Sequence, residues 1–218
     1  MQRVLEPEVM DTAEEAKGYD AMDHGPANAA FVARLVELNA KGRMLDIGCG
    51  PGHIALLVCE RLPAAQVVAV DLALHMLAFA ERHVAASPHK DRVDLRHADA
   101  KALPFPDGSF DAVFSNTILH HIPDPRLFLK EARRVLRPGG ALLIRDLFRP
   151  PTAERAAELT QLHAADATPY QQELLRASLC AALTPEELRK IANEAGLRKA
   201  ELVTDSDRHM SLQIAAES

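Results

Sequence analysis

The sequence predicts an α/β protein whose sheet is mostly parallel and is covered by helices on both faces. Three observations support this fold class. Short apolar, strand-like segments alternate with helical patterns through most of the chain, and such alternation is typical of parallel sheets. A glycine-rich turn joins the first strand to the helix after it. Two final strand-like segments lie too close together for a helical crossover, so they should pair antiparallel.

The first strand and its turn form the segment RMLDIGCGPGH at residues 43–53. Gly48, Gly50 and Gly52 follow the apolar run at every second position, and a helical pattern begins at His53. Glycine permits positive φ angles and a close approach of a ligand to the main chain. The helix N-terminus adds free N–H groups and a positive partial charge. The segment therefore predicts a loop that binds a nucleotide-like ligand.

The spacing of these glycines differs from two well-known phosphate-binding patterns. A dinucleotide-binding turn has its third glycine three residues after the second, where this chain has His53. A Walker loop needs Lys and then Ser or Thr after its last glycine, and this loop has neither. Three alternating glycines also fit a tight strand-to-helix turn without a ligand, so the loop alone leaves both interpretations open.

The other elements are placed by their periodicity and by turn residues. The expected strands cover residues 43–47, 66–71, 92–99, 110–116 and 140–146, with a final pair at about 198–204 and 209–216. The expected helices cover about 27–39, 53–62, 72–82, 125–137 and 184–196. Arg137-Pro-Gly-Gly is expected to end the fourth of these helices. Thr184 is expected to cap the fifth, with Glu187 three residues later.

Two segments without a strand pattern are expected to cover one end of the sheet. Residues 150–183 open with two prolines and continue as a helical, alanine- and glutamate-rich insertion. Residues 1–39 are polar at first and end in an amphipathic helix. We expect one domain over residues 1–218, with residues 1–39 as an N-terminal helical lid and residues 150–183 as a helical cap insertion.

Length and composition limit the possible function classes. The 218 residues suit one domain, and hydrophobic residues make up 48%, enough for a full core. A net charge of −6 and an aromatic content of 4% argue against a nucleic-acid partner. Cys49, Cys59 and Cys180 fit neither a disulfide framework nor a zinc site. Free thiols of this kind suit a reducing compartment.

The start of the chain, MQRVLEPEVMDTAEEA, is acidic and lacks the apolar stretch of a signal peptide. No apolar segment approaches the length needed to span a membrane. These features predict a cytoplasmic protein without membrane attachment. Asp20, Asp23 and His24 would share one face of a helix. This face is expected to be solvated, and no metal site is expected.

Four stretches together resemble the class I S-adenosylmethionine-dependent methyltransferases, in particular those that act on small molecules. They are LDIGCGPG (45–52), AVDLALHML (69–77), ADAKALPFPDGSFDAVFSN (98–116) with LHHIPDP (119–125), and LRPGGALLI (136–144). The resemblance implies a Rossmann-like three-layer sandwich with seven strands in the order 3-2-1-4-5-7-6, the last strand antiparallel. It also implies S-adenosylmethionine as cofactor, S-adenosylhomocysteine as product and a small-molecule methyl acceptor.

The resemblance assigns the methionine and ribose parts of the cofactor to the glycine loop. The loop at Gly48, Cys49 and Gly50 would pass close to both parts, and Tyr19 would close over them from the lid. Asp46 would face the cofactor's amino group, where a carboxylate suits a cation. A carboxylate at this position also fits a simpler role, in which it only caps the turn.

The ribose and adenine contacts are assigned to the ends of the second and third strands. Asp71 would accept hydrogen bonds from both ribose hydroxyls, or it would serve only as the N-cap of the next helix. Leu72 and Met76 would flank the adenine, although ordinary core packing explains Met76 nearly as well. Asp99 would receive the adenine amino group, and the main chain of Ala100 would contact the ring.

The reaction implied is an in-line displacement at the sulfonium methyl group, in which orientation of the acceptor is a large part of catalysis. Asn116 would face this methyl group. It lacks the Pro-Pro-Tyr that follows such an Asn in enzymes that methylate exocyclic amines, so base methylation is doubtful. His121 is the catalytic candidate, as a general base, with His120 and Asp146 as further candidates. The histidine pair would equally well only hold its loop.

Other functions remain open at this stage. A nicotinamide-dependent oxidoreductase shares the strand, the glycine turn and the acidic residue, but differs in glycine spacing. A non-catalytic sensor or scaffold would keep the cofactor motifs, because binding and transfer depend on different parts of a site. Methylation of a protein or RNA would require a basic surface patch. The favoured interpretation has a small-molecule partner, no nucleic acid, no membrane, and a monomer or homodimer.

Overall fold

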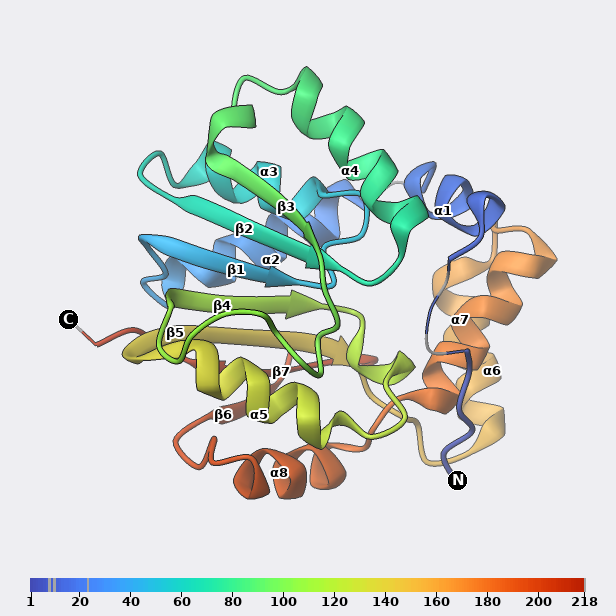
Figure 1. Cartoon of the computed structure of the whole chain (residues 1–218). Coiled ribbons are helices and arrows are strands. Elements are labelled where there is room, and N and C mark those ends of the chain that lie inside the picture. Colours follow the sequence, from blue (N-terminus) through green and yellow to red (C-terminus); the bar gives the residue numbers. More distant parts are fainter. Residues whose placement is uncertain (8, 10, 23, 218) are drawn as a thin grey trace.

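In the computed structural model, which describes residues 1–7, 9, 11–22 and 24–217, a single sheet forms the centre of the molecule. Its strands are Arg43–Ile47 (β1), Gln66–Asp71 (β2), Val93–His97 (β3), Phe110–Asn116 (β4), Leu136–Leu147 (β5), Glu201–Thr204 (β6) and His209–Ile214 (β7). Their spatial order is β3-β2-β1-β4-β5-β7-β6 (Figure 1). β7 runs antiparallel to both of its neighbours. The predicted fold class and strand order are confirmed.

Helices pack on both faces of the sheet and make it the middle of three layers. They are Gly25–Glu37 (α2), His53–Arg61 (α3) and Leu74–Ala86 (α4) on one face, and Pro125–Val135 (α5) and Pro185–Glu194 (α8) on the other. Neighbouring residues of a strand point to opposite faces, so Met44 packs in the same cluster as Phe31 and Phe114. Leu45 packs in the other cluster, with Phe128.

Three helices lie beyond the carboxyl ends of the parallel strands (Figure 1). They are Ala13–Asp20 (α1), Ala153–Ala164 (α6) and Pro169–Ala181 (α7). Leu147, at the end of β5, packs with Leu159 of α6 and Leu179 of α7. The two segments expected to cover the sheet therefore both have helices at this end. Their division into a lid and a cap remains a prediction.

The boundary between α5 and β5 differs from the sequence prediction. α5 ends before Arg137, and β5 begins at Leu136 instead of Gly140. Phe110 of β4 pairs with Leu136, whereas Ala112 pairs with Ala141, so β5 carries extra residues between the two pairs. The Arg137-Pro-Gly-Gly segment therefore forms a bulge inside a strand and is not a helix-ending turn.

Candidate functional site

A cavity opens at the carboxyl ends of the strands, next to the point where chain order reverses between β1 and β4. Open α/β sheets bind their ligands at this point. The cavity wall contains eleven of the predicted site residues: Tyr19, Gly48, Cys49, Gly50, Asp71, Leu72, Met76, Asp99, Ala100, Asn116 and His121. These residues come from distant parts of the chain, and the fold brings them together. Asp46 and the further catalytic candidates His120 and Asp146 do not line the cavity.

The glycine loop is held against β2 by its own main chain. The N–H groups of Gly48 and the residue after it both donate to the Val70 carbonyl, at 2.8 and 3.0 Å. Gly48 has a φ of 74°, and a Cβ there would lie 2.6 Å from the Ile118 side chain. A Cβ on Gly50 would meet nothing closer than the Tyr19 ring at 3.9 Å. Packing therefore requires glycine at position 48, whereas the space beside Gly50 is open to the cavity.

Asp71, at the end of β2, is fixed by two main-chain N–H groups. Its Oδ2 accepts from Gly50 and its Oδ1 from Ala73, each at 2.8 Å. Burial raises the pKa of this carboxyl, and the two N–H groups oppose the rise. Ala73 is extended, so α4 begins at Leu74 and not at the predicted Leu72. Each carboxylate oxygen keeps a lone pair for a further donor, such as one of two neighbouring hydroxyls.

Asp46 lies behind the cavity wall, with only 2% of the residue exposed. Among the described residues, its Oδ2 has no hydrogen-bond partner. Burial and the charge of Asp71 raise the pKa of Asp46 well above its usual range. A buried carboxylate oxygen without a donor is unfavourable. An ammonium group, which the sequence prediction places here, is a donor of the kind that this oxygen lacks.

Tyr19 of α1 forms part of the cavity wall. Its ring stacks on His24, with centroids 4.6 Å apart, and packs with Met76. Burial and the charges of three carboxylates, the first of them Asp71, raise the pKa of Tyr19 to about 12, so its hydroxyl stays neutral. Met76 lines the cavity and also packs on Ala16. Its packing role is observed, and its contact with the adenine stays a prediction.

Asp99 and Ala100 follow β3 on the cavity wall. The Asp99 Oδ1 accepts from the Lys101 N–H at 2.8 Å and lies 3.0 Å from the Lys101 Nζ. Burial opposes ionisation, but the contacts with Lys101 lower the pKa of Asp99. Lys101 lines the cavity as well. Sequence reasoning missed it, because nothing in the sequence separates this lysine from the others.

The chain turns sharply after Asn116, the last residue of β4. Thr117 has a φ of 63°, a conformation that β-branched residues rarely adopt. Its N–H donates to the Arg145 carbonyl at 2.8 Å. The turn places Ile118 and His121 on the cavity wall. Backbone strain of this kind is common at functional sites, but a positive φ at threonine has no sequence signature, so Thr117 was missed.

The two histidines after β4 have different surroundings. His120 is buried, and its Nδ1 lies 2.6 Å from the Asp146 Oδ1. Neither residue lines the cavity, and Asp146 pairs with His120 instead. His121 lines the cavity, and burial together with the charge of His120 lowers its pKa to about 4. Its imidazole is thus neutral and a weak base. Glu6, 3.6 Å from the His121 Nδ1, was missed because it is far away in sequence.

His53, in the first turn of α3, connects the N-terminal helices to the sheet. Its Nε2 lies 3.1 Å from the Asp20 Oδ1, and its ring stacks on His83. The His83 Nε2 lies 3.5 Å from the same carboxylate oxygen. Asp20 therefore links α1 to both α3 and α4. The helix face that was expected to be solvated is engaged in these contacts at Asp20. Asp23, from the same predicted face, lies outside the described residues.

A family model described as a methyltransferase domain matches residues 45–144. A demethylmenaquinone methyltransferase of Thermus thermophilus is 44% identical over 128 residues, which are 57% of this chain and 57% of the relative. A 27-O-demethylrifamycin SV methyltransferase of Amycolatopsis mediterranei is 36% identical over 135 residues, or 59% and 49% of the two chains. The chain thus spans about half the length of these curated relatives.

Solved structures extend the likeness to the whole chain. A putative S-adenosyl-L-methionine-dependent methyltransferase from Methanococcus maripaludis has a TM-score of 0.74 at 18% identity, and the match covers 100% of this chain and 98% of that one. This likeness shows the fold. A phosphoethanolamine N-methyltransferase 2 of Haemonchus contortus, solved in complex with S-adenosyl-L-methionine, has a TM-score of 0.68 at 26% identity. That match covers 89% of this chain and 44% of the other.

Proposed function

We propose that the chain is a class I S-adenosylmethionine-dependent methyltransferase and that it transfers a methyl group from this cofactor to a small molecule. The observation that carries the proposal is the meeting of three of the four sequence stretches, those at 45–52, 69–77 and 98–125, at one cavity. The names of the matched relatives support it, because they act on quinone, rifamycin and phosphoethanolamine compounds. Those compounds are the relatives' own, and for this chain we propose only that the acceptor is a small molecule.

The cavity wall suggests how the cofactor is held. Asp71 accepts hydrogen bonds from the two ribose hydroxyls, through the lone pairs that its N–H partners leave unused. Leu72 and Met76 provide apolar surface for the adenine, and Asp99 accepts from its amino group. Asp46 receives the ammonium group of the methionine part, which supplies the missing donor for its buried oxygen. When bound, the cofactor supplies a methyl group activated by a positively charged sulfur.

The acceptor binds next to Asn116 and beneath the N-terminal segment. Val9, Ile118 and Ile122 make that part of the wall apolar, which favours an organic acceptor over a highly charged one. The protein holds the acceptor atom in line with the methyl group and excludes water, and such positioning lowers the barrier substantially. A neutral acceptor must also lose a proton. His121 is the predicted base that reaches the cavity.

Two further features of the proposal concern partners and location. Among the described residues, no helix has both the length and the apolar character that crossing a membrane requires. With the net charge of −6, we retain the predictions of a cytoplasmic protein, no nucleic-acid partner, and a monomer or homodimer. The nicotinamide-dependent alternative is not favoured, because the glycine spacing and the family match both differ from it.

The experiment that tests this function is turnover of S-adenosylmethionine with a panel of small acceptors. Candidate classes are phenols, quinols, hydroxylated macrocycles and small amines. Release of S-adenosylhomocysteine that depends on one acceptor class, and that is lost in Asp71→Ala, is the expected result. Tight cofactor binding without transfer to any class would favour the alternative of a non-catalytic sensor or scaffold.

A further inference from the structure

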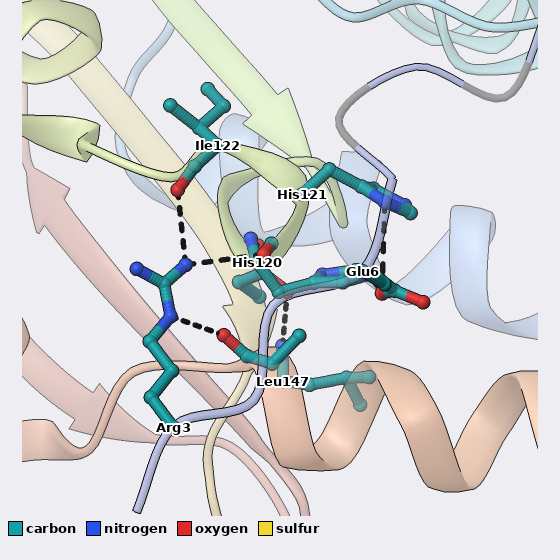
Figure 2. Close-up of polar contacts among 8 residues, drawn as sticks. Arg3, Glu6, His120, His121, Ile122 and Leu147 are labelled. Carbon is teal, nitrogen blue, oxygen red and sulfur yellow. Dashed lines mark hydrogen bonds and ion pairs between the residues drawn. The ribbon is translucent and has the colours of Figure 1, made fainter.

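Three potential metal ligands converge beside the cavity, at the point where the N-terminal segment crosses the turn after β4. They are the Oε1 of Glu6, the Nε2 of His120 and the Nδ1 of His121. Glu6 Oε1 lies 3.4 Å from the His120 Nε2 and 3.6 Å from the His121 Nδ1. All three atoms lie within 4.8 Å of one another. In Figure 2 the Glu6 side chain extends from the N-terminal segment toward the two imidazoles.

Two of these atoms lack a hydrogen-bond partner. Within the described part of the chain, Glu6 Oε1 and His121 Nδ1 are buried and make no hydrogen bond. Buried polar atoms are nearly always satisfied, so each exception calls for an explanation such as a missing ion or water. Here the two unsatisfied atoms face each other across 3.6 Å. A single cation between them would satisfy both.

His120 is oriented in the way that metal-bound histidines are. Its Nδ1 lies 2.6 Å from the Asp146 Oδ1, and its main-chain N–H donates to the other oxygen of the same carboxylate at 2.9 Å. Asp146 therefore fixes the orientation of the ring through Nδ1, and Nε2 lies on the side of Glu6. A carboxylate behind a ligating histidine fixes the tautomer and raises the basicity of the ligand nitrogen.

The N-terminal segment that carries Glu6 is itself anchored. The Arg3 guanidinium donates to the carbonyls of His120, Ile122 and Ala181, at 3.1, 3.0 and 2.5 Å. Figure 2 shows Arg3 reaching the turn that carries both histidines. Glu6 is thus placed opposite the histidines by contacts that involve none of the three potential ligand atoms.

We propose that Glu6, His120 and His121 form a binding site for a divalent transition-metal ion such as Zn²⁺ or Co²⁺. Two ligands at about 2.0–2.1 Å from a tetrahedral metal lie about 3.3–3.4 Å apart, close to the 3.4 and 3.6 Å that separate Glu6 Oε1 from the two histidine nitrogens. Two imidazoles and a carboxylate are also the ligand types such ions prefer. Three protein ligands leave a fourth position free. His121 lines the cavity and Glu6 and His120 do not, so the metal would lie behind the cavity wall.

This site would change the role of His121. A bound metal occupies the lone pair on Nδ1, so this nitrogen could not accept a proton from the acceptor. The metal site does not depend on the proposed methyl transfer, because the ion binds to the chain alone. It can therefore be tested without cofactor or acceptor.

A second cluster, Asp20, His53 and His83, serves as an internal comparison. Its side chains are all partly exposed. The Asp20 oxygen already has a hydrogen bond with His53. No buried atom of this cluster is left without a partner among the described residues. The structure therefore favours the first cluster.

The test is a titration of the chelator-treated full chain with Co²⁺, followed by calorimetry and by the visible absorption of four-coordinate Co²⁺. We expect one equivalent to bind, and Zn²⁺ to displace it. Glu6→Gln and His121→Gln should each weaken binding more than about 100-fold, because loss of an outer partner alone costs roughly 10–100-fold. Asp146→Asn, which changes only an outer partner, should weaken Co²⁺ binding roughly 10–100-fold.

Asp20→Asn is the matched control and should leave Co²⁺ binding unchanged. Thermal unfolding of every variant in the absence of metal checks that the fold is intact, and Glu6→Gln is nearly isosteric with the original residue. The proposal would be overturned if the folded wild-type chain bound neither Co²⁺ nor Zn²⁺ stoichiometrically. It would equally be overturned if binding survived Glu6→Gln and was lost in Asp20→Asn.

Discussion

At the residue scale, Asp46 is unusual because the ligand-free chain gains nothing from its charge. The buried Oδ2 has no donor among the described residues, and burial with the charge of Asp71 raises the pKa of Asp46. Asp46→Asn should therefore stabilise the ligand-free protein by about 1–3 kcal/mol, the scale for an unsatisfied buried group. The same substitution should weaken S-adenosylhomocysteine binding. Urea unfolding and calorimetry measure the two effects, and a loss of both stability and affinity would refute this role.

Asp71 should behave differently, because its oxygens already have partners. Asp71→Ala should weaken S-adenosylhomocysteine binding by about 1–3 kcal/mol, since two hydroxyls lose their acceptor. It should also destabilise the protein, because the N–H groups of Gly50 and Ala73 lose theirs. Asp94→Ala, at an exposed position of β3, is the control for affinity. Unchanged affinity in Asp71→Ala would show that the ribose lies elsewhere.

His209 makes stability depend on pH. Burial and the positive charges of Arg145 and Arg208 lower its pKa to about 4. The unfolded chain binds this proton near pH 6.5, so the stabilisation is complete above pH 6.5. It is lost as the pH falls toward 4, by at most about 3 kcal/mol.

His209→Asn should therefore lose less stability than the wild type between pH 7 and pH 4.5 in urea unfolding. Parallel curves for the wild type and His209→Asn would contradict the assignment.

At the scale of elements, the glycine loop and α1 give a matched pair of substitutions. Gly48 has a φ of 74°, and a Cβ would press on Ile118. Gly48→Ala should cost about 2–4 kcal/mol, from the left-handed conformation and the overpacking together. Gly18 in α1 has nothing within 4 Å of such a Cβ, so Gly18→Ala should stabilise the protein by about 0.5–1 kcal/mol. Thermal unfolding compares them, and an equal effect would contradict the packing described at the loop.

Local sequence signals predicted the elements well where one pattern dominated. Thr184 and Glu187 form the predicted capping box at α8, and the apolar segments of β1, β2 and β4 lie where they were expected. The bulge in β5 was not predictable, because Arg137-Pro-Gly-Gly carries the same turn residues whether it ends a helix or bends a strand. The pairing of β4 with Leu136 decides between them, and that contact is not local in sequence.

At the scale of the whole molecule, topology explains what the sequence could not show. The strand order follows from the motifs, and it brings eleven predicted residues to one cavity. The first residues of the chain carry no motif, yet Arg3 and Glu6 contact the turn after β4. Lys101 and Thr117 also join the cavity without a sequence signal. These contacts depend on how distant segments fold back on the sheet, which composition and periodicity do not encode.

The central claim is that the cavity binds S-adenosylmethionine, and calorimetry with its product S-adenosylhomocysteine tests it most directly. NAD is titrated in parallel, and Asp71→Ala serves as the site-directed comparison. We expect the wild type to bind S-adenosylhomocysteine at one site per chain, Asp71→Ala to bind it more weakly, and NAD to give no heat of binding. Binding of NAD alone, or of neither compound, would contradict the account.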